Sequence, residues 1–154
     1  MSLPIIFNSK AIKESYVTEL LKSNKKIKKY GLTLTSKEVS KIVEVRNDIL
    51  ENYDRVELGI QVTKKLIEDF SSSSYVDEND YIFVLNELQE IFYYLKNETE
   101  DRIGDIQLID IIRKCFENEC GGSVELLKSK LQEFVKEFRR KIEIEENINE
   151  GGVY

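Results

Sequence analysis

Apolar side chains recur every three or four residues along most of this chain, and this spacing is that of one face of an α-helix. The longest such stretch forms a single seam with a coiled-coil-like period: Tyr81, Val84, Leu85, Leu88, Ile91, Phe92 and Leu95. The 154 residues include only one proline and seven glycines, so few residues would interrupt long helices. Since no segment alternates as a half-buried strand does, the sequence predicts an all-α fold.

The same spacing predicts about six helices joined by short connections. The expected helices span residues 8–30, 35–53, 56–70, 80–101, 105–120 and 123–144. Because each helix has an apolar face that must be buried against another, a helical bundle is the simplest arrangement. The apolar fraction of 41% and the length fit one hydrophobic core. We therefore expect one helical bundle domain over residues 8–145, with flexible termini at 1–7 and 146–154.

Local signals mark several expected helix ends. The candidate N-terminal caps are Asn8-Ser9, Thr35, Asp105 and Ser123. Thr35 is followed three residues later by Glu38, which is the pattern of a capping box. Gly31 can adopt the left-handed conformation that ends a helix, and Gly121-Gly122 end another. The serines at 71–74 should separate the third helix from the fourth.

One charged residue, Arg46, falls on the apolar stripe of the second expected helix. It stands between Val43 and Ile49, so its side chain must either extend to the surface or meet a carboxylate.

The sequence lacks the residues that several classes of catalytic and metal-binding site need. The chain has no histidine, which excludes Ser-His-Asp and Cys-His mechanisms. Cys115 and Cys120 cannot complete a structural zinc site by themselves, and we expect them to be buried thiols. Gly121-Gly122 lack the lysine of a phosphate-binding loop. We therefore expect no cofactor, and the residue types argue against an enzyme without excluding one.

A line of acidic residues on the fourth expected helix suggests an alternative. Glu87, Glu90, Tyr94, Glu98 and Asp101 are three or four residues apart and share a face outside the apolar seam. Helical nucleotide pyrophosphohydrolases hold magnesium with acidic pairs, which Glu87 with Glu90 and Glu98 with Asp101 imitate. The plainer interpretation is a solvated acidic face, because acidic residues are frequent in this chain.

The charges are distributed unevenly. The formal net charge is −6, which argues against general nucleic-acid binding. Residues 1–30 nevertheless carry seven lysines and two acids, whereas residues 77–110 carry two basic residues and ten acids. Lys25, Lys26, Lys28 and Lys29 lie at a helix end, where the helix dipole favours cations. RNA binding through residues 22–29 is a second alternative function.

Aromatic residues next to this acidic line suggest a contact surface for a protein partner. Phe92, Tyr93 and Tyr94 are consecutive, so they cannot all point into one core. The candidate binding residues are Tyr93, Tyr94, Lys96, Asn97, Glu98 and Asp101. The leading functional hypothesis is a non-enzymatic bundle that acts through a protein partner or by self-association. No small-molecule ligand is indicated.

The sequence resembles a known protein family in five stretches. They are GLTLT at 31–35, RVELG at 55–59, YVDENDY at 75–81, NELQEIFYYLKNET at 86–99 and GGSVELL at 121–127. This family comprises small bacterial proteins with a domain of unknown function, mainly from Gram-positive anaerobes, and the likeness covers residues 8 to 135. The resemblance implies a cytosolic bacterial protein and brings no activity or site residues. No apolar run reaches the roughly 18 residues of a membrane span, and no signal peptide is recognisable, so we expect a cytoplasmic location.

Overall fold

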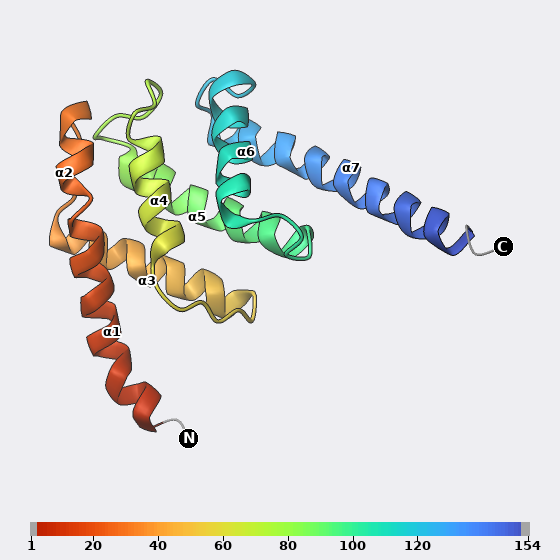
Figure 1. Cartoon of the computed structure of the whole chain (residues 1–154). Coiled ribbons are helices and arrows are strands. Elements are labelled where there is room, and N and C mark those ends of the chain that lie inside the picture. The colour runs from red at the N-terminus through yellow and green to blue at the C-terminus, as the bar shows by residue number, and fades with distance from the viewer. Residues whose placement is uncertain (1–2, 152–154) are drawn as a thin grey trace. The chain divides into compact units, whose positions relative to one another are not determined.

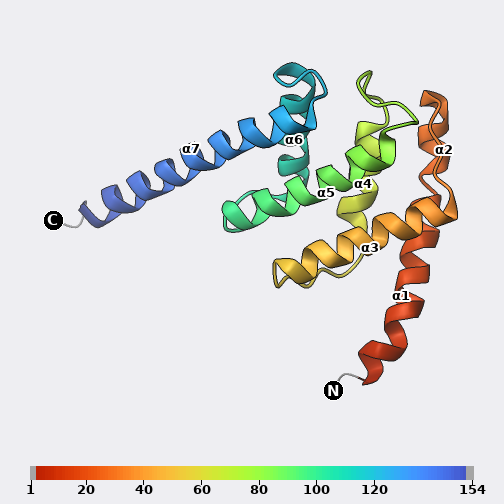
Figure 2. The ribbon, with the colours of Figure 1, turned by 180° about the vertical axis from the view of Figure 1, so that it is seen from behind.

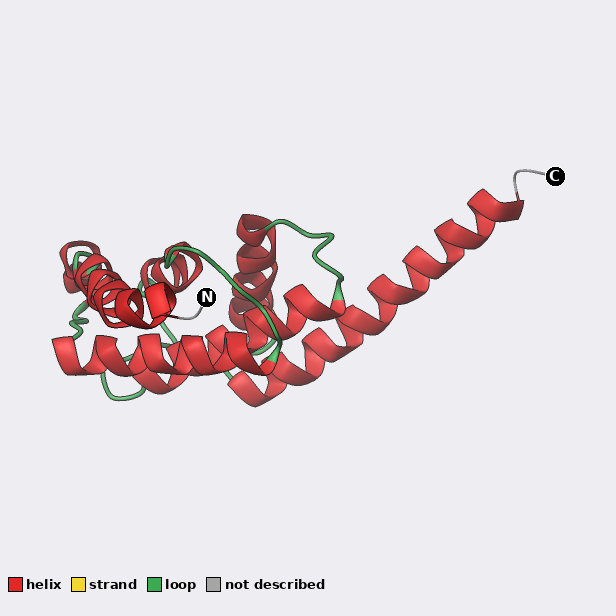
Figure 3. Ribbon diagram, turned by 90° about the horizontal axis from the view of Figure 1, so that it is seen from below, coloured by secondary structure: helices red, strands yellow, loops and turns green. Residues whose placement is uncertain are grey.

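The structure, a computed structural model, describes residues 3–151 and the side chains of residues 10–148. Within residues 3–151 every regular element is a helix, as Figure 3 shows, which confirms the predicted all-α helical bundle. The elements in chain order are α1 (Leu3–Leu21), α2 (Asn24–Ile27), the 3₁₀ helix η1 (Lys28–Tyr30), α3 (Ser36–Asn52), α4 (Gln61–Phe70), α5 (Tyr81–Glu98), α6 (Asp105–Asn118) and α7 (Val124–Gly151).

Contacts within the chain divide it into two compact units, one ending at Tyr93 and one beginning at Tyr94. The first contains α1 to α4 and most of α5, and the second contains the end of α5 with α6 and α7. The expected single domain with boundaries at residues 8 and 145, and the flexibility of the termini, stay predictions.

In the first unit, α1 packs against both α3 and α4 (Figures 1 and 2). The core is made by residues predicted from the helical period, including Leu20, Ile42, Val43, Leu66, Ile67, Phe70, Leu85, Leu88 and Phe92, all at most 1% exposed. Gln89 of α5 lies within this core and accepts a hydrogen bond from the Thr63 hydroxyl of α4 at 2.7 Å. Its amide nitrogen donates to the carbonyl of Ile42 of α3 at 3.2 Å. This buried side chain therefore ties three helices together.

In the second unit, α6 packs against α7. Leu108, Ile109, Ile112 and Phe116 of α6 and Leu127, Leu131 and Val135 of α7 are buried between them. The Ser123 hydroxyl accepts a hydrogen bond from the Leu126 amide at 3.2 Å, so the predicted cap of the last helix is confirmed.

Helix ends agree with the sequence in some places and not in others. The capping box is confirmed, because the Glu38 amide donates to the Thr35 hydroxyl at 3.1 Å and the Glu38 carboxylate accepts from the Thr35 amide at 2.9 Å. Gly31 ends η1 with φ 79°, as expected. The predicted cap Asp105 is wrong. The N-cap is Gly104, whose amide donates to the Gln107 side chain at 3.3 Å, and Asp105 is the first helical residue.

The first helix predicted over residues 8–30 starts earlier and is divided, because α1 ends at Leu21 and is followed by α2 and η1, whereas the last helix is longer than predicted. The helix start expected at Asn8-Ser9 is wrong, because α1 begins at Leu3. Pro4 is compatible with this start, since the first turn of a helix needs no amide hydrogen from that residue. α7 continues to Gly151, and its residues from Ile144 to Glu150 include neither proline nor glycine.

Candidate interaction surface

The loop of residues 54–59, which joins α3 to α4, exposes the two most solvent-accessible large apolar side chains among the described residues. Val56 and Leu58 are each 92% exposed, whereas Arg55, Glu57 and Gly59 between and beside them are half-buried. This strict alternation indicates that successive side chains point to opposite sides of the loop. A residue with positive φ marks each end of the loop, Asp54 at 52° and Gly59 at 86°. The loop thus exposes Val56 and Leu58, whereas the charged residues Arg55 and Glu57 beside them are half-buried.

The side chain of Arg46 of α3 is buried and binds the backbone of this loop. The residue is 3% exposed. One terminal nitrogen donates to the carbonyl of Glu57 at 2.9 Å and to the carbonyl of Gly59 at 2.6 Å. The other donates to the Asn47 side chain at 2.9 Å. Of the two alternatives predicted for Arg46, the structure shows the second, because the carboxylate of Glu57 lies 3.7 Å away.

Two tyrosines from other helices complete the attachment of the loop. The Gly59 amide donates to the phenol oxygen of Tyr16 of α1 at 2.9 Å, and the guanidinium of Arg46 lies 5.1 Å from the centre of the Tyr16 ring. The Tyr93 hydroxyl of α5 donates to the Glu57 carboxylate at 2.5 Å. Burial raises the pKa of Tyr93, and the neighbouring Glu57 carboxylate raises it further. Helices α1 and α3 therefore hold the backbone of residues 57–59, and α5 binds the side chain of Glu57.

The contacts of the loop backbone keep Val56 and Leu58 exposed. A flexible loop could fold its apolar residues back onto the protein, but hydrogen bonds from a buried arginine and two tyrosines restrain this one. Isolated exposed aliphatic residues are common on protein surfaces. Here two such residues, each 92% exposed, stand on a backbone that polar contacts hold in place.

The sequence interpretation missed this loop and placed a helix over residues 56–70. That expectation is wrong for residues 56–60, since α4 begins at Gln61. Gly59 adopts a left-handed conformation, and its carbonyl and that of Glu57 bind Arg46 instead of continuing a helix. The signal that could have revealed the loop is the alternation of charged and apolar residues in Arg55-Val56-Glu57-Leu58, which has period two.

The predicted contact surface around Tyr93 and Tyr94 is only partly accessible. Placing Tyr93 on an exposed surface is wrong, because this residue is 0% exposed and its hydroxyl is bound to Glu57. Its ring packs edge-on against Phe92 with centroids 4.9 Å apart. Tyr94 is half-buried, and burial followed by the charge of Glu98 raises its pKa. Of the two phenols, only that of Tyr94 reaches the surface.

The remaining candidate binding residues belong to the second unit, where two of them make internal contacts. Lys96 is half-buried, donates to the carbonyl of Ile103 at 2.9 Å and pairs with Asp105 at 2.6 Å. The backbone carbonyl of Glu98 accepts from Arg139 of α7 at 3.0 Å, and the two side chains lie 3.6 Å apart. These contacts attach the end of α5 to the loop before α6 and to α7.

The other two candidates have different surroundings. Asn97 is half-buried, and Asp101 is exposed in the turn after α5, with φ 58°. The binding role of Tyr94, Lys96, Asn97, Glu98 and Asp101 stays a prediction.

The acidic line of α5 is not gathered into a metal site. Glu90 accepts a hydrogen bond from the Tyr53 hydroxyl at 3.4 Å, Glu98 faces Arg139, and Asp101 lies beyond the end of the helix. Glu87 is half-buried. Among the described residues, no three His, Cys, Asp or Glu side chains are grouped so that they could hold a metal ion. The magnesium hypothesis thus rests on sequence spacing alone.

The basic residues near the end of the first predicted helix contact nearby acids. Lys22 pairs with Glu19 at 3.2 Å, and Lys26 pairs with Glu68 of α4 at 3.0 Å. The Lys29 ammonium lies 5.3 Å from the centre of the Tyr30 ring. These contacts give part of the cluster a structural explanation, and RNA binding by residues 22–29 stays a prediction.

Comparison with known proteins places the chain in a family. The family described as "Family of unknown function (DUF6323)" matches residues 19–144. No curated protein and no solved structure matches the chain significantly. Within the described residues, no helix combines the length and the apolar character that crossing a membrane requires. Since the match covers most of the sequence, this chain belongs to the DUF6323 family of unknown function.

Proposed function

We propose that this chain is a protein-interaction module that inserts Val56 and Leu58 into an apolar groove of a partner protein. The observation that carries the proposal is that both side chains are 92% exposed on a loop fixed by the buried Arg46. A fixed loop loses little conformational freedom on binding, and this preorganisation favours affinity. The proposal retains the non-enzymatic interaction module inferred from the sequence and moves its contact surface to the loop.

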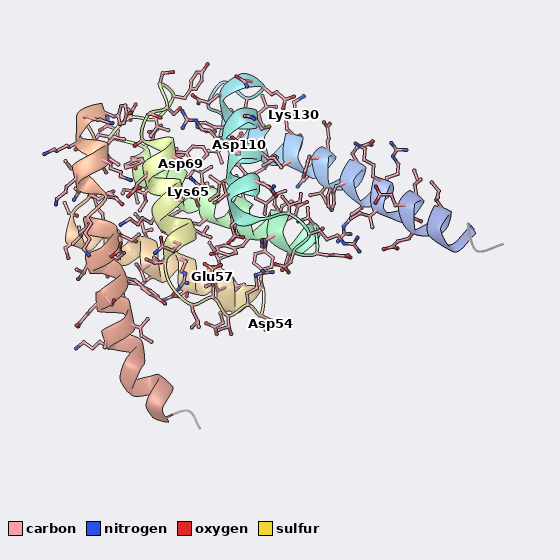
Figure 4. The ribbon with its side chains drawn as sticks, viewed as in Figure 1. Asp54, Glu57, Lys65, Asp69, Asp110 and Lys130 are labelled. Atoms are coloured by element: carbon pink, nitrogen blue, oxygen red, sulfur yellow. The ribbon has the colours of Figure 1, made fainter. Side chains whose placement is uncertain are left out.

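The charged residues around the loop indicate which charges the partner carries. Asp54 is exposed two residues before Val56, Glu51 is exposed near the end of α3, and Glu57 lies between the two apolar residues with a side chain 26% exposed. Figure 4 marks Asp54 and Glu57 on the loop at the end of α3. A groove that receives Val56 and Leu58 would therefore meet acidic groups at its edge, and the complementary partner has basic residues there.

The free energy gained by burying Val56 and Leu58 in the partner determines how much their replacement should weaken binding. Burying a fully exposed valine or leucine side chain is worth about 1.5–3 kcal/mol, so the two together are worth about 3–6 kcal/mol. Because each 1.4 kcal/mol is a factor of ten in affinity, loss of both should weaken binding by at least roughly 100-fold. The same substitutions should hardly affect folding, since both side chains are already in water.

The test compares wild type with a Val56→Ser, Leu58→Ser double variant and with an Ile106→Ser control. Ile106 is 69% exposed on α6, so the control removes another exposed apolar side chain. Proteins captured from the native cells by the wild type are identified and purified, and the affinity of each variant for them is measured. The proposal expects a weakening of at least roughly 100-fold for the double variant and no change for the control. Equal affinity of wild type and double variant would contradict it.

Self-association is a separate outcome of the same experiment. Sedimentation of the purified chain over a range of concentrations shows whether it forms oligomers. If the wild type associates and the double variant does not, the groove belongs to a second copy of this chain and the proposed hetero-partner is wrong.

The proposed module acts in the cytoplasm of a bacterium. Both cysteines are free thiols, which fits a reducing compartment. The sequence resemblance supports the bacterial origin.

A further inference from the structure

Cys115 and Cys120 form a pair of thiols at the end of α6. Their sulfur atoms are 3.6 Å apart, and neither residue is bound in a disulfide. The amide of Cys120 donates to the carbonyl of Cys115 at 3.1 Å, so their backbones lie side by side. A disulfide bond needs sulfurs about 2.05 Å apart, and the remaining gap can be closed by side-chain rotation with a small backbone adjustment.

The backbone around the pair suits such an adjustment. Cys115 is held in the last turn of α6, whereas Cys120 lies beyond the end of that helix. Gly121 and Gly122 follow with φ of 54° and 83°, and the Gly122 amide donates to the carbonyl of Phe116 at 3.0 Å. Since glycine populates these angles without steric cost, the turn on the Cys120 side can shift more readily than the helix.

A surface cavity gives reagents access to one of the two thiols. Each cysteine is less than 8% exposed, but Cys115 lines a cavity of about 290 Å³ between α6 and α7. Leu131 and Phe134 of α7 form an apolar wall of this cavity, and Lys130 of α7, labelled in Figure 4, also lines it. Cys120 is not among the residues that line this cavity. A small disulfide can therefore reach Cys115 through this cavity.

We propose that Cys115 and Cys120 are a thiol–disulfide exchange site that forms an intramolecular disulfide with a small aliphatic disulfide as co-reactant. The Cys115 thiol loses its proton to water and attacks one sulfur of the reagent. A mixed disulfide forms, and one thiolate leaves. Cys120 then loses its proton and attacks the Cys115 sulfur, which releases the second thiolate. The chain loses two electrons and two protons, and the reagent gains them as two thiols.

The surroundings of Cys115 affect the rate and the direction of this exchange. Burial, followed by the hydrogen bond with Cys120 and the nearby Glu119, raises the pKa of Cys115 to about 12. Because the thiolate is the attacking species, the first step is slow at neutral pH and faster in alkaline buffer. In a reducing cytoplasm such a disulfide would be transient, as in redox-sensing proteins.

The test uses the full chain with bis(2-hydroxyethyl) disulfide in mildly alkaline buffer, followed by intact mass and by titration of free thiols. The wild type should fall from two titratable thiols to none and lose the mass of two hydrogen atoms, without retaining any reagent. A sample of the same chain in denaturant serves as the control for the reagent. If the denatured chain reacts fully but the folded chain keeps both thiols, the proposal is overturned. It is also overturned if the folded wild type ends with reagent bound to its cysteines.

Two variants test the order of attack. The Cys120→Ser variant should stop at the mixed disulfide and retain half of the reagent on Cys115. The Cys115→Ser variant should react more slowly than Cys120→Ser, since Cys120 does not line the cavity. Equal rates in the two variants, with helical circular-dichroism spectra in both, would overturn the assignment of Cys115 as the first thiol to react.

Discussion

Arg46 shows how a single residue determines the structure of a whole loop. Leaving a guanidinium buried is costly unless it is hydrogen-bonded, and here it donates to two carbonyls of the loop and to the Asn47 side chain, with the Glu57 carboxylate 3.7 Å away. The sequence predicted that Arg46 would either extend to the surface or meet a carboxylate, because it stands on an apolar stripe. It could not predict which carboxylate, because Glu57 comes close only through the turn that Gly59 permits.

Replacing this arginine should therefore loosen the loop and destabilise the fold. In the Arg46→Met variant, the carbonyls of Glu57 and Gly59 lose their donor, and we expect a loss of about 2–4 kcal/mol in the free energy of unfolding. Chemical denaturation measures this change. The matched control is Lys41→Met on the exposed side of α3, which should change stability by less than about 0.5 kcal/mol. Equal stability of Arg46→Met and wild type would show that the arginine does not hold the loop.

At the scale of the helices, ion pairs attach α1 to its neighbours in the first unit. Glu19 of α1 pairs with Lys64 of α4 at 2.6 Å, and Lys13 of α1 pairs with Glu44 of α3 at 2.9 Å. The hydrogen bond from Lys64 lowers the pKa of Glu19 below its usual 4.5, and the bond from Lys22 adds to this effect. A carboxylate whose pKa is lower in the folded state stabilises the fold above about pH 4.5 and loses this contribution as the pH falls.

The Glu19→Gln variant tests this attachment. It should melt at a lower temperature than wild type at neutral pH, and the difference should shrink as the pH falls through the lowered pKa of Glu19, because the wild-type carboxylate is then protonated as well. Thermal unfolding at a series of pH values measures both curves. Glu14→Gln, an exposed position on the same helix, serves as the control and should show little difference at any pH. A gap between Glu19→Gln and wild type that stays constant into acid would contradict the ion-pair explanation.

The helices themselves were largely predictable, and their connections were not. The seam from Tyr81 to Leu95 and the Thr35 capping box depend on residues close in sequence, and both are as expected. The start of α4 and the burial of Tyr93 depend on contacts between residues 13 to 36 positions apart, such as Arg46 with Gly59 and Tyr93 with Glu57. Spacing along one helix carries no information about such contacts.

For the molecule as a whole, the proposed contact surface is the loop of residues 54–59, not the predicted one around Tyr93, Tyr94, Lys96, Asn97, Glu98 and Asp101, nor the alternative acidic line of α5. Sequence spacing placed Glu87, Glu90, Glu98 and Asp101 in a line, but contacts with Tyr53 and Arg139 occupy two of them. The loop was overlooked because a short segment with two apolar residues also fits a helical period. Its exposed side chains become informative only once the buried residues that hold the backbone are known.

Site-specific photo-cross-linking in the native cells tests the central claim most directly. Leu58 is replaced by the photoreactive amino acid benzoylphenylalanine, and the same replacement at the exposed Ile106 is the control. If the loop inserts into a partner, Leu58 should yield a discrete cross-linked product that contains one defined protein, and Ile106 should not. No product from Leu58, or the same products from both positions, would contradict a contact surface at Val56 and Leu58.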